Sequence, residues 1–205
     1  MNSEAWDQRY RDGSADWPEG PAPGVDALTR SLPPGDALEM ACGTGRNAIY
    51  LARAGWSVTA VDFAATALDI ARRRASVEIP EAGIEWLHRD LTRRKPPESS
   101  FDLVVITYLH IPWELFLPVL ESAEAAVRPG GTLFVLGHDR SNVTEGTGKP
   151  KHIDVTYTAG ELAAALERCS VMQEEVVKRS PDHGATANPE VLQIDCVVRA
   201  RRDLP

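Results

Sequence analysis

Short apolar runs alternate with amphipathic stretches between residues 37 and 136. The runs predict strands, and the stretches between most of them predict helices. A series of this kind is typical of a parallel sheet with helices on both faces. The predicted strands are 37–40, 57–61, 84–88, 103–107 and 132–136. The predicted helices are 46–54, 65–75 and one from Pro112 to about Val127, which ends at Pro129-Gly130-Gly131.

The two ends of the chain have other patterns. Residues 1–24 predict a short amphipathic helix and then a Pro/Gly-rich loop, and residues 25–32 predict a second helix. A helix over 158–169 is predicted to begin with a capping box of Thr158 and Glu161. Residues 170–178 and 191–200 alternate like two strands of an antiparallel hairpin at the sheet edge. No linker is evident, so we expect one domain over 1–205, in which residues 1–35 form an N-terminal helical and loop cap.

Composition narrows the function classes. The net charge is -8, from 22 basic and 30 acidic residues, which disfavours a surface that binds nucleic acid or anionic lipid. No apolar run reaches the roughly 18 residues of a membrane span, and the polar, acidic N-terminus is unlike a signal peptide. The three cysteines are widely spaced, which indicates reduced thiols, a cytoplasmic protein and no metal site.

A glycine turn follows the first predicted strand. Gly43 and Gly45 form a Gly-x-Gly sequence, and Asp62, seventeen residues past Gly45, ends the second strand. Glycine lets the backbone approach a bound adenosine cofactor, and the acid can accept hydrogen bonds from both ribose hydroxyls. The same residues, with Ala48, also fit the dinucleotide fingerprint, so the turn alone leaves the cofactor open.

Glu39 favours one kind of cofactor. This acid lies near the end of the first strand, where the pyrophosphate of a dinucleotide would pass. A carboxylate there repels phosphate but attracts an ammonium group. S-adenosylmethionine carries such an ammonium group, together with a sulfonium and no phosphate.

The segment Glu39–Gly45 resembles the first motif of class I S-adenosylmethionine-dependent methyltransferases. Further segments fit the family in order over residues 37–138: Asp62, His88-Arg89-Asp90-Leu91, Phe101–Val105 and Arg128–Leu133. Residues 45–52 are similar to the tellurite-resistance and thiopurine-type small-molecule methyltransferases. One departure is Ala41, which stands where the motif usually has glycine.

The resemblance implies a fold and a reaction. The fold is a Rossmann-like three-layer α/β sandwich with a mostly parallel seven-stranded sheet, in the order 3-2-1-4-5-7-6, and a C-terminal antiparallel hairpin. The reaction is methyl transfer from S-adenosylmethionine to an O, N, S or chalcogen atom of a small molecule, by in-line displacement. We expect a monomer or homodimer with no nucleic-acid or membrane partner.

The resemblance also implies which residues bind the cofactor. Glu39 would orient the methionine ammonium, Asp62 would bind the ribose, and Asp90 would accept from the adenine amino group. The other implied contacts come from Ala41, Gly43, Gly45, Arg46, Asn47, Phe63, Leu91 and Thr107, with Trp6, Tyr10 and Trp17 closing over the cofactor.

Two histidines are candidates for catalysis. His110 follows the fourth strand and His138 the fifth, so both lie at the carboxyl end of the sheet, where ligands bind in open α/β folds. His138 could act as a general base with its neighbour Asp139. The basic, glycine-rich loop within 140–157 could be a lid, and Arg140, Lys149 and Lys151 would favour an anionic or polar substrate.

Two other functions compete with this prediction. A nicotinamide-dependent oxidoreductase would fit the glycine turn, but Glu39 disfavours it and no Tyr-x-x-x-Lys sequence is present. A protein that binds S-adenosylmethionine without catalysis is the second alternative.

Overall fold

The computed structural model describes residues 3–14, 20–146, 152–180 and 192–204. Contacts between Cα atoms divide the chain into two compact units. The first unit consists of Met1–Arg94 and Phe101–Val105, and the second of Lys95–Ser100 and Ile106–Pro205. The single domain expected from the sequence remains a prediction.

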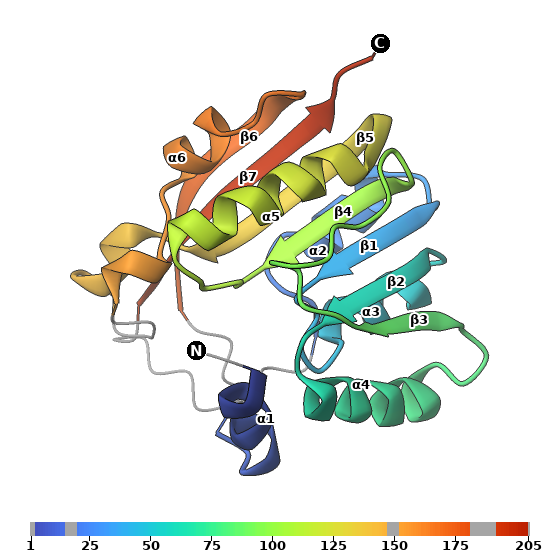
Figure 1. The fold of residues 1–205 in the computed structure, drawn as a ribbon. Helices are drawn as coiled ribbons and strands as arrows, with labels where there is room; N and C mark the ends of the chain where they lie inside the picture. The colour runs from blue at the N-terminus through green and yellow to red at the C-terminus, as the bar shows by residue number, and fades with distance from the viewer. Residues whose placement is uncertain (1–2, 15–19, 147–151, 181–191, 205) are drawn as a thin grey trace. The chain divides into compact units, whose positions relative to one another are not determined.

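The described strands form a seven-stranded sheet in the order β3-β2-β1-β4-β5-β7-β6, as predicted (Figure 1). Pairing of β1 with β2 and of β2 with β3 is parallel, whereas β7 pairs antiparallel with both β5 and β6. The mixed sheet and its C-terminal hairpin confirm the fold class. The strands are β1 (Asp36–Met40), β2 (Ser57–Asp62), β3 (Ile84–His88), β4 (Phe101–Thr107), β5 (Val127–His138), β6 (Cys169–Arg179) and β7 (Gln193–Arg202).

The helices lie close to their predicted positions. Thr158 and Glu161 form the predicted capping box, since the Thr158 side chain accepts from the Glu161 backbone and Glu161 accepts from the Thr158 backbone. The helices are α1 (Ser3–Arg11), α2 (Val25–Ser31), α3 (Arg46–Arg53), α4 (Ala65–Glu78), α5 (Trp113–Ala126) and α6 (Ala159–Ala164), with short 3-10 helices η1 (Arg140–Val143) and η2 (Ile153–Val155).

Two predicted boundaries are wrong. The strand β5 begins at Val127 rather than at 132, so residues 129–131 lie inside it. At this point α5 ends, and the carbonyls of Ala125 and Ala126 accept hydrogen bonds from the backbone N–H groups of Ser99 and Ser100. The last predicted helix ends at Ala164 rather than 169. One reason is that the Arg168 N–H donates to the Glu124 carboxylate and β6 begins at the next residue.

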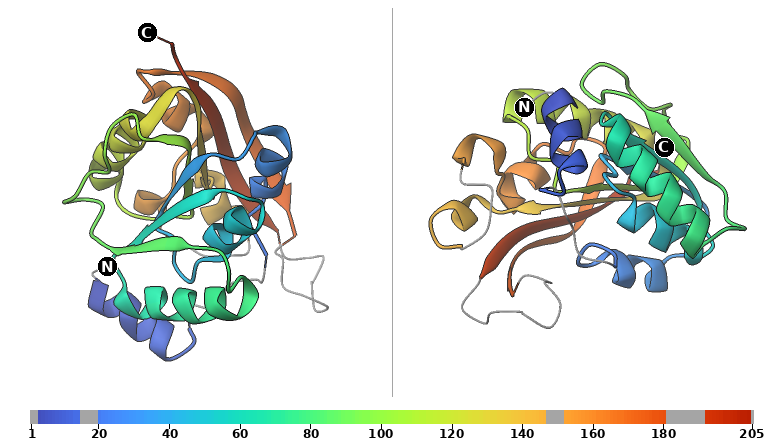
Figure 2. Two further views of the ribbon diagram at one scale, coloured as in Figure 1. Left: turned by 90° about the vertical axis from the view of Figure 1, so that its right-hand side faces the viewer. Right: turned by 90° about the horizontal axis from the view of Figure 1, so that it is seen from below.

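In the first unit, α3 and α4 pack on the sheet of β1, β2 and β3, and α1 packs on α4 (Figures 1 and 2). Leu38 and Met40 of β1, Ile49 of α3 and Leu68 of α4 are fully buried. This apolar core places the carboxyl ends of β1 and β2 next to the turn that leads into α3.

In the second unit, α5 packs on β5, and α6 packs on β6 and β7. Phe116, Leu120, Leu133 and Phe134 are buried there. The hairpin of β6 and β7 has a register shift between Val171 and Gln173. None of the helices in the described ranges combines the length and apolar character that a membrane span needs.

Candidate functional site

The glycine turn after β1 is held by backbone hydrogen bonds. Cys42 donates to Val61 over 3.0 Å, and Gly45 donates to Cys42 over 2.9 Å. Gly45 has φ of 78°, and a Cβ on it would lie 2.6 Å from the indole of Trp86. Gly45 is therefore required by the close packing of this turn on β3 as well as by its left-handed backbone. A Cβ on Gly43 would lie 3.1 Å from the Tyr10 hydroxyl, so Tyr10 of α1 lies over the turn.

Asp62 fixes the turn from the end of β2. One carboxylate oxygen accepts from the Gly43 N–H over 2.8 Å, and the other accepts from the Ala64 N–H at the start of α4 over 2.9 Å. Burial raises the pKa of Asp62, although these backbone hydrogen bonds oppose the rise. Each oxygen has a second lone pair, so the carboxylate can still accept two ribose hydroxyls.

Glu39 lies fully buried on β1 beside the start of α3. Its Oε1 accepts from Asn47 Nδ2 over 2.8 Å, and Asn47 Oδ1 accepts from the Ala22 N–H over 2.7 Å. Its Oε2 is buried and has no hydrogen-bond partner among the described residues. Burial raises the pKa of Glu39 from 4.5 to about 7. A buried carboxylate oxygen without a donor is costly, and a cation placed against it would remove that cost.

Ala41 has φ of 61°, in the left-handed region. An L-residue in that region costs about 1–2 kcal/mol, and glycine avoids the clash at some loss of backbone entropy. We therefore expect Ala41→Gly to increase the free energy of unfolding by about 1 kcal/mol, measured by urea denaturation. The control is Ala75→Gly in the last turn of α4, which should lower the free energy of unfolding by about 1 kcal/mol. A destabilising Ala41→Gly would contradict this backbone assignment.

The segment after β3 forms a turn. Asp90 Oδ1 accepts from both the backbone N–H and the hydroxyl of Thr92, and Oδ2 lies 3.4 Å from Arg93 Nε. Asp90 and the neighbouring Leu91 are half-buried. Binding of adenine by this segment remains a prediction. Phe63 is half-buried too, and its carbonyl lies 2.9 Å from His88 Nε2.

The N-terminal helix α1 supplies two aromatic rings to the first unit. The rings of Trp6 and Tyr10 lie 5.8 Å apart, and the Arg9 guanidinium lies over Trp6. Asp7 Oδ1 accepts from the Thr66 N–H over 2.7 Å, in the first turn of α4. This hydrogen bond holds α1 against α4. Trp17, the third predicted aromatic contact, lies outside the described residues.

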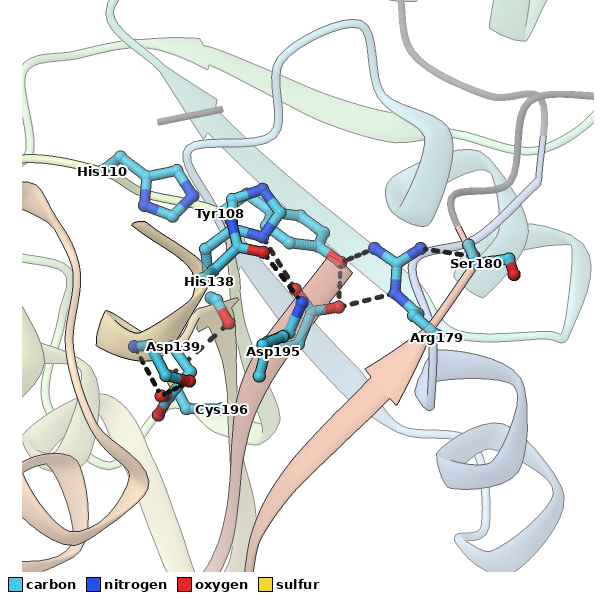
Figure 3. Close-up of polar contacts among 12 residues, drawn as sticks. Tyr108, His110, His138, Asp139, Arg179, Ser180, Asp195 and Cys196 are labelled. Atoms are coloured by element: carbon cyan, nitrogen blue, oxygen red, sulfur yellow. Dashed lines mark hydrogen bonds and ion pairs between the residues drawn. The ribbon is translucent and has the colours of Figure 1, made fainter. Parts of the chain in front are cut away.

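A polar cluster in the second unit contains His138 (Figure 3). His138 Nδ1 lies 2.8 Å from Asp195 Oδ1 on β7, and both residues are buried. The predicted partner, Asp139, was wrong: its carboxylate accepts from the backbone and hydroxyl of Ser141 and caps η1. The antiparallel register places Asp195 directly opposite His138, whereas Asp139 points to the other side of the strand.

Asp195 is held by two further side chains. Arg179 Nε donates to its Oδ2 over 2.6 Å, and the Tyr108 hydroxyl donates to the same oxygen over 3.0 Å. Burial would raise the pKa of Asp195, but the hydrogen bond from His138 and the charge of Arg179 outweigh it and lower the pKa. Tyr108 has φ of 54°, directly after β4. Strain of this kind in a non-glycine residue is common at functional sites.

His110 lies against His138 with the rings stacked, 5.0 Å between centroids and 5° between planes. Its Nδ1 lies 3.1 Å from the Val155 carbonyl, and its buried Nε2 has no partner among the described residues. Burial first, and the neighbouring His138 second, lower the pKa of His110 to about 4. His110 is therefore neutral at physiological pH.

The other residues predicted from the sequence do not belong to the clusters described above. Thr107 is buried at the end of β4, and Arg46 is half-buried at the start of α3. Arg140 is paired with Glu161 over 2.7 Å. Lys149 and Lys151 lie outside the described residues, so the lid remains a prediction. Within the described ranges, no group of three or more His, Cys, Asp or Glu side chains is arranged to hold a metal ion.

Known proteins with similar sequences are methyltransferases. A family model described as a methyltransferase domain matches residues 37–131. An uncharacterised methyltransferase of Mycobacterium tuberculosis is 38% identical over 99 residues, which cover 48% of either chain. The chain thus spans about half the length of this curated relative. A probable thiol methyltransferase of Arabidopsis thaliana is 30% identical over 185 residues, which cover 85% of this chain and 79% of that protein.

Solved structures agree with the fold. One similar solved structure concerns the conversion of a disulfide bond into a thioacetal group during echinomycin biosynthesis. It matches this chain with a TM-score of 0.76 and 23% sequence identity, over 98% of this chain and 92% of that one. The sheet order, the glycine turn and these relatives show that the chain belongs to the class I S-adenosylmethionine-dependent methyltransferases. Within that family, the thiol methyltransferase relative agrees with the predicted similarity to the tellurite-resistance and thiopurine-type enzymes.

Proposed function

We propose that this chain transfers the methyl group of S-adenosylmethionine to a nucleophilic atom of a small molecule. The observation that carries the proposal is the buried Oε2 of Glu39, to which no described residue donates a hydrogen bond. The methionine ammonium group supplies a cation for that oxygen, whereas the phosphates of a nicotinamide cofactor would be repelled by it. S-adenosylmethionine brings a methyl group made electrophilic by its sulfonium.

Several residues have proposed roles in holding this methyl donor. Glu39, oriented by Asn47, binds the ammonium. Asp62 binds the ribose hydroxyls with the lone pairs that its backbone hydrogen bonds leave free. Asp90 binds the adenine amino group, and its Oδ2, which the turn with Thr92 does not use, can accept that hydrogen bond. The other proposed contacts are Ala41, Gly43, Gly45, Arg46, Phe63 and Leu91, with Trp6 and Tyr10 over the turn and Thr107 at the methionine end.

The acceptor is proposed to be a small molecule methylated on oxygen, nitrogen, sulfur or another chalcogen. The Arabidopsis relative is named for a thiol acceptor, which adds support for sulfur. The acidic composition favours neither nucleic acid nor membrane as a partner. A cytoplasmic monomer or homodimer remains the prediction from the sequence.

Thermal unfolding with two ligands tests the choice of cofactor. S-adenosylhomocysteine at about 100 times its Kd is expected to raise the Tm by about 5–10 °C, since a ligand that binds only the folded state stabilises it. NADH at the same concentration should leave the Tm unchanged. The reverse pattern would overturn the proposal in favour of an oxidoreductase.

A second experiment separates catalysis from simple binding. Methyl-labelled S-adenosylmethionine is incubated with the protein and a metabolite extract. Transfer of label to a small molecule is the expected result. Stabilisation by S-adenosylhomocysteine without transfer to any compound would favour the alternative of a non-catalytic binding protein.

A further inference from the structure

The hydrogen bond between His138 and Asp195 fixes the tautomer of His138. A carboxylate only accepts, so Nδ1 of His138 carries the proton that points to Asp195 Oδ1, 2.8 Å away. When the ring is neutral, its Nε2 has a free lone pair. No described residue is hydrogen-bonded to this Nε2, so the lone pair is available to a ligand.

The tautomer of His110 follows from the same argument. The Val155 carbonyl only accepts, so His110 Nδ1 is the donor and Nε2 is the acceptor. That Nε2 is buried and has no hydrogen-bond partner within the part of the chain that the structure describes. A buried acceptor without a donor is unfavourable, and a ligand with an N–H, O–H or S–H group would satisfy it.

The two stacked rings therefore present two lone pairs within one small region of the second unit (Figure 3). The Asp195 carboxylate next to His138 is paired with the Arg179 guanidinium over 2.6 Å. Burial raises the pKa of the Tyr108 hydroxyl well above its usual range, so Tyr108 stays neutral and donates to Asp195. The lone pairs of two acceptors repel an anion, so the two rings suit a neutral hydrogen-bond donor.

We propose that His110 and His138 bind the methyl acceptor, and that this acceptor is a neutral molecule whose reacting atom carries a proton. The molecule offers that proton to His138 Nε2 and a second O–H, N–H or S–H group to His110 Nε2. This inference rests on the proposed methyl transfer. It adds the class of substrate to the proposed function. Asp195 is a positioning residue that orients His138, and Arg179 and Tyr108 are positioning residues that hold Asp195.

The reaction step balances without a further reactant. The bond from the methyl carbon to the sulfonium sulfur breaks, and its electron pair stays on sulfur as S-adenosylhomocysteine forms. A lone pair of the acceptor atom forms the new bond to the methyl carbon. The proton of that atom passes to His138 Nε2, and the resulting imidazolium is stabilised by Asp195. Release of this proton to solvent restores the neutral ring.

Two matched compounds test the binding part of the proposal. Resorcinol is a neutral ring with two O–H donors, and 1,3-dimethoxybenzene has the same ring without donors. With the protein saturated with S-adenosylhomocysteine, NMR is expected to show saturable shifts of the His110 and His138 ring signals on addition of resorcinol only. Equal shifts from both compounds, or no shift from resorcinol up to its solubility limit, would overturn the proposal.

Single substitutions identify the histidines. His110→Gln and His138→Gln are each expected to weaken resorcinol binding at least tenfold, with the affinity for S-adenosylhomocysteine unchanged. The exposed His152 provides the matched control, and His152→Gln should bind resorcinol like the unsubstituted protein. Unchanged resorcinol binding by both site variants would contradict the inference. If S-adenosylhomocysteine fails to bind the unsubstituted protein, the proposed function fails, while the resorcinol shifts still report on the histidines.

The positioning role of Asp195 has its own readout. The ¹⁵N shifts of His138 are expected to show the Nδ1–H tautomer, and Asp195→Asn should increase the share of the Nε2–H tautomer. An unchanged tautomer in a folded Asp195→Asn variant would remove Asp195 from the proposed mechanism.

Discussion

Replacing Glu39 by glutamine is expected to weaken binding of S-adenosylhomocysteine by about 10- to 100-fold while stabilising the ligand-free protein at pH 8. The affinity loss follows from removing one charged hydrogen-bond partner of the ammonium group, which contributes about 1.5–3 kcal/mol. The stability gain follows from the buried carboxylate, whose pKa rises from 4.5 to about 7 on folding. Such a rise corresponds to about 3 kcal/mol.

The pH dependence gives the sign of the stability effect. A carboxyl group whose pKa is raised by folding costs nothing below pH 4.5, costs progressively more between pH 4.5 and about 7, and costs its full amount above pH 7. Urea denaturation should therefore show the gain from Glu39→Gln at pH 8 and lose it near pH 4.5. Exposed Glu81 provides the control, since Glu81→Gln should change neither stability nor affinity.

Calorimetry adds a test of the same charge. Binding of an ammonium group favours the ionised form of Glu39, so ligand binding near pH 6.5 should release a proton, and Glu39→Gln should abolish that release. Full affinity in a Glu39→Gln variant would show that the ammonium group is bound elsewhere.

Asp62→Asn is expected to lower the free energy of unfolding by about 1–3 kcal/mol and to reduce S-adenosylhomocysteine binding at least tenfold. An asparagine has one acceptor oxygen, so either the Gly43 or the Ala64 N–H would face the amide NH₂ group instead of an oxygen. Urea denaturation and calorimetry measure the two effects. Asp69, exposed on α4 in an ion pair with Arg72, is the control, and Asp69→Asn should change stability by less than about 0.5 kcal/mol. Wild-type affinity in a folded Asp62→Asn variant would exclude Asp62 from ribose binding.

The sequence predicted those parts of the molecule that depend on neighbouring residues. The capping box at Thr158 was confirmed because local turn chemistry determines it, whereas the strand order, also confirmed, came from the resemblance to the methyltransferase family. The start of β5 was missed because it depends on Ser99 and Ser100, whose N–H groups donate to the Ala125 and Ala126 carbonyls at the end of α5 from a separate part of the chain. Helix boundaries of this kind are decided by tertiary hydrogen bonds that no local pattern contains.

The partners of His138 in the polar cluster were also beyond a prediction from local sequence. His138 was a candidate, but its partner Asp195 is 57 residues away on another strand. The predicted hairpin placed the two strands in one sheet without fixing their register, and a shift of one residue would have turned Asp195 away from His138. Arg179 and Tyr108 carried no motif that marks them as partners of Asp195. The orphaned oxygen of Glu39 likewise became visible only with side-chain positions.

Asn47 constrains which amino acids position 47 can hold. Its amide donates to Glu39 and accepts from the Ala22 N–H, so both ends of one short planar group are in use. Aspartate would satisfy Ala22 but set a second negative charge beside Glu39, and leucine would leave both partners unsatisfied. Glutamine has both groups on a side chain longer by one methylene, which moves them away from the positions that face Glu39 and Ala22. Any laboratory evolution of this enzyme toward a new methyl acceptor should therefore leave Asn47 unchanged and draw its variation from other positions.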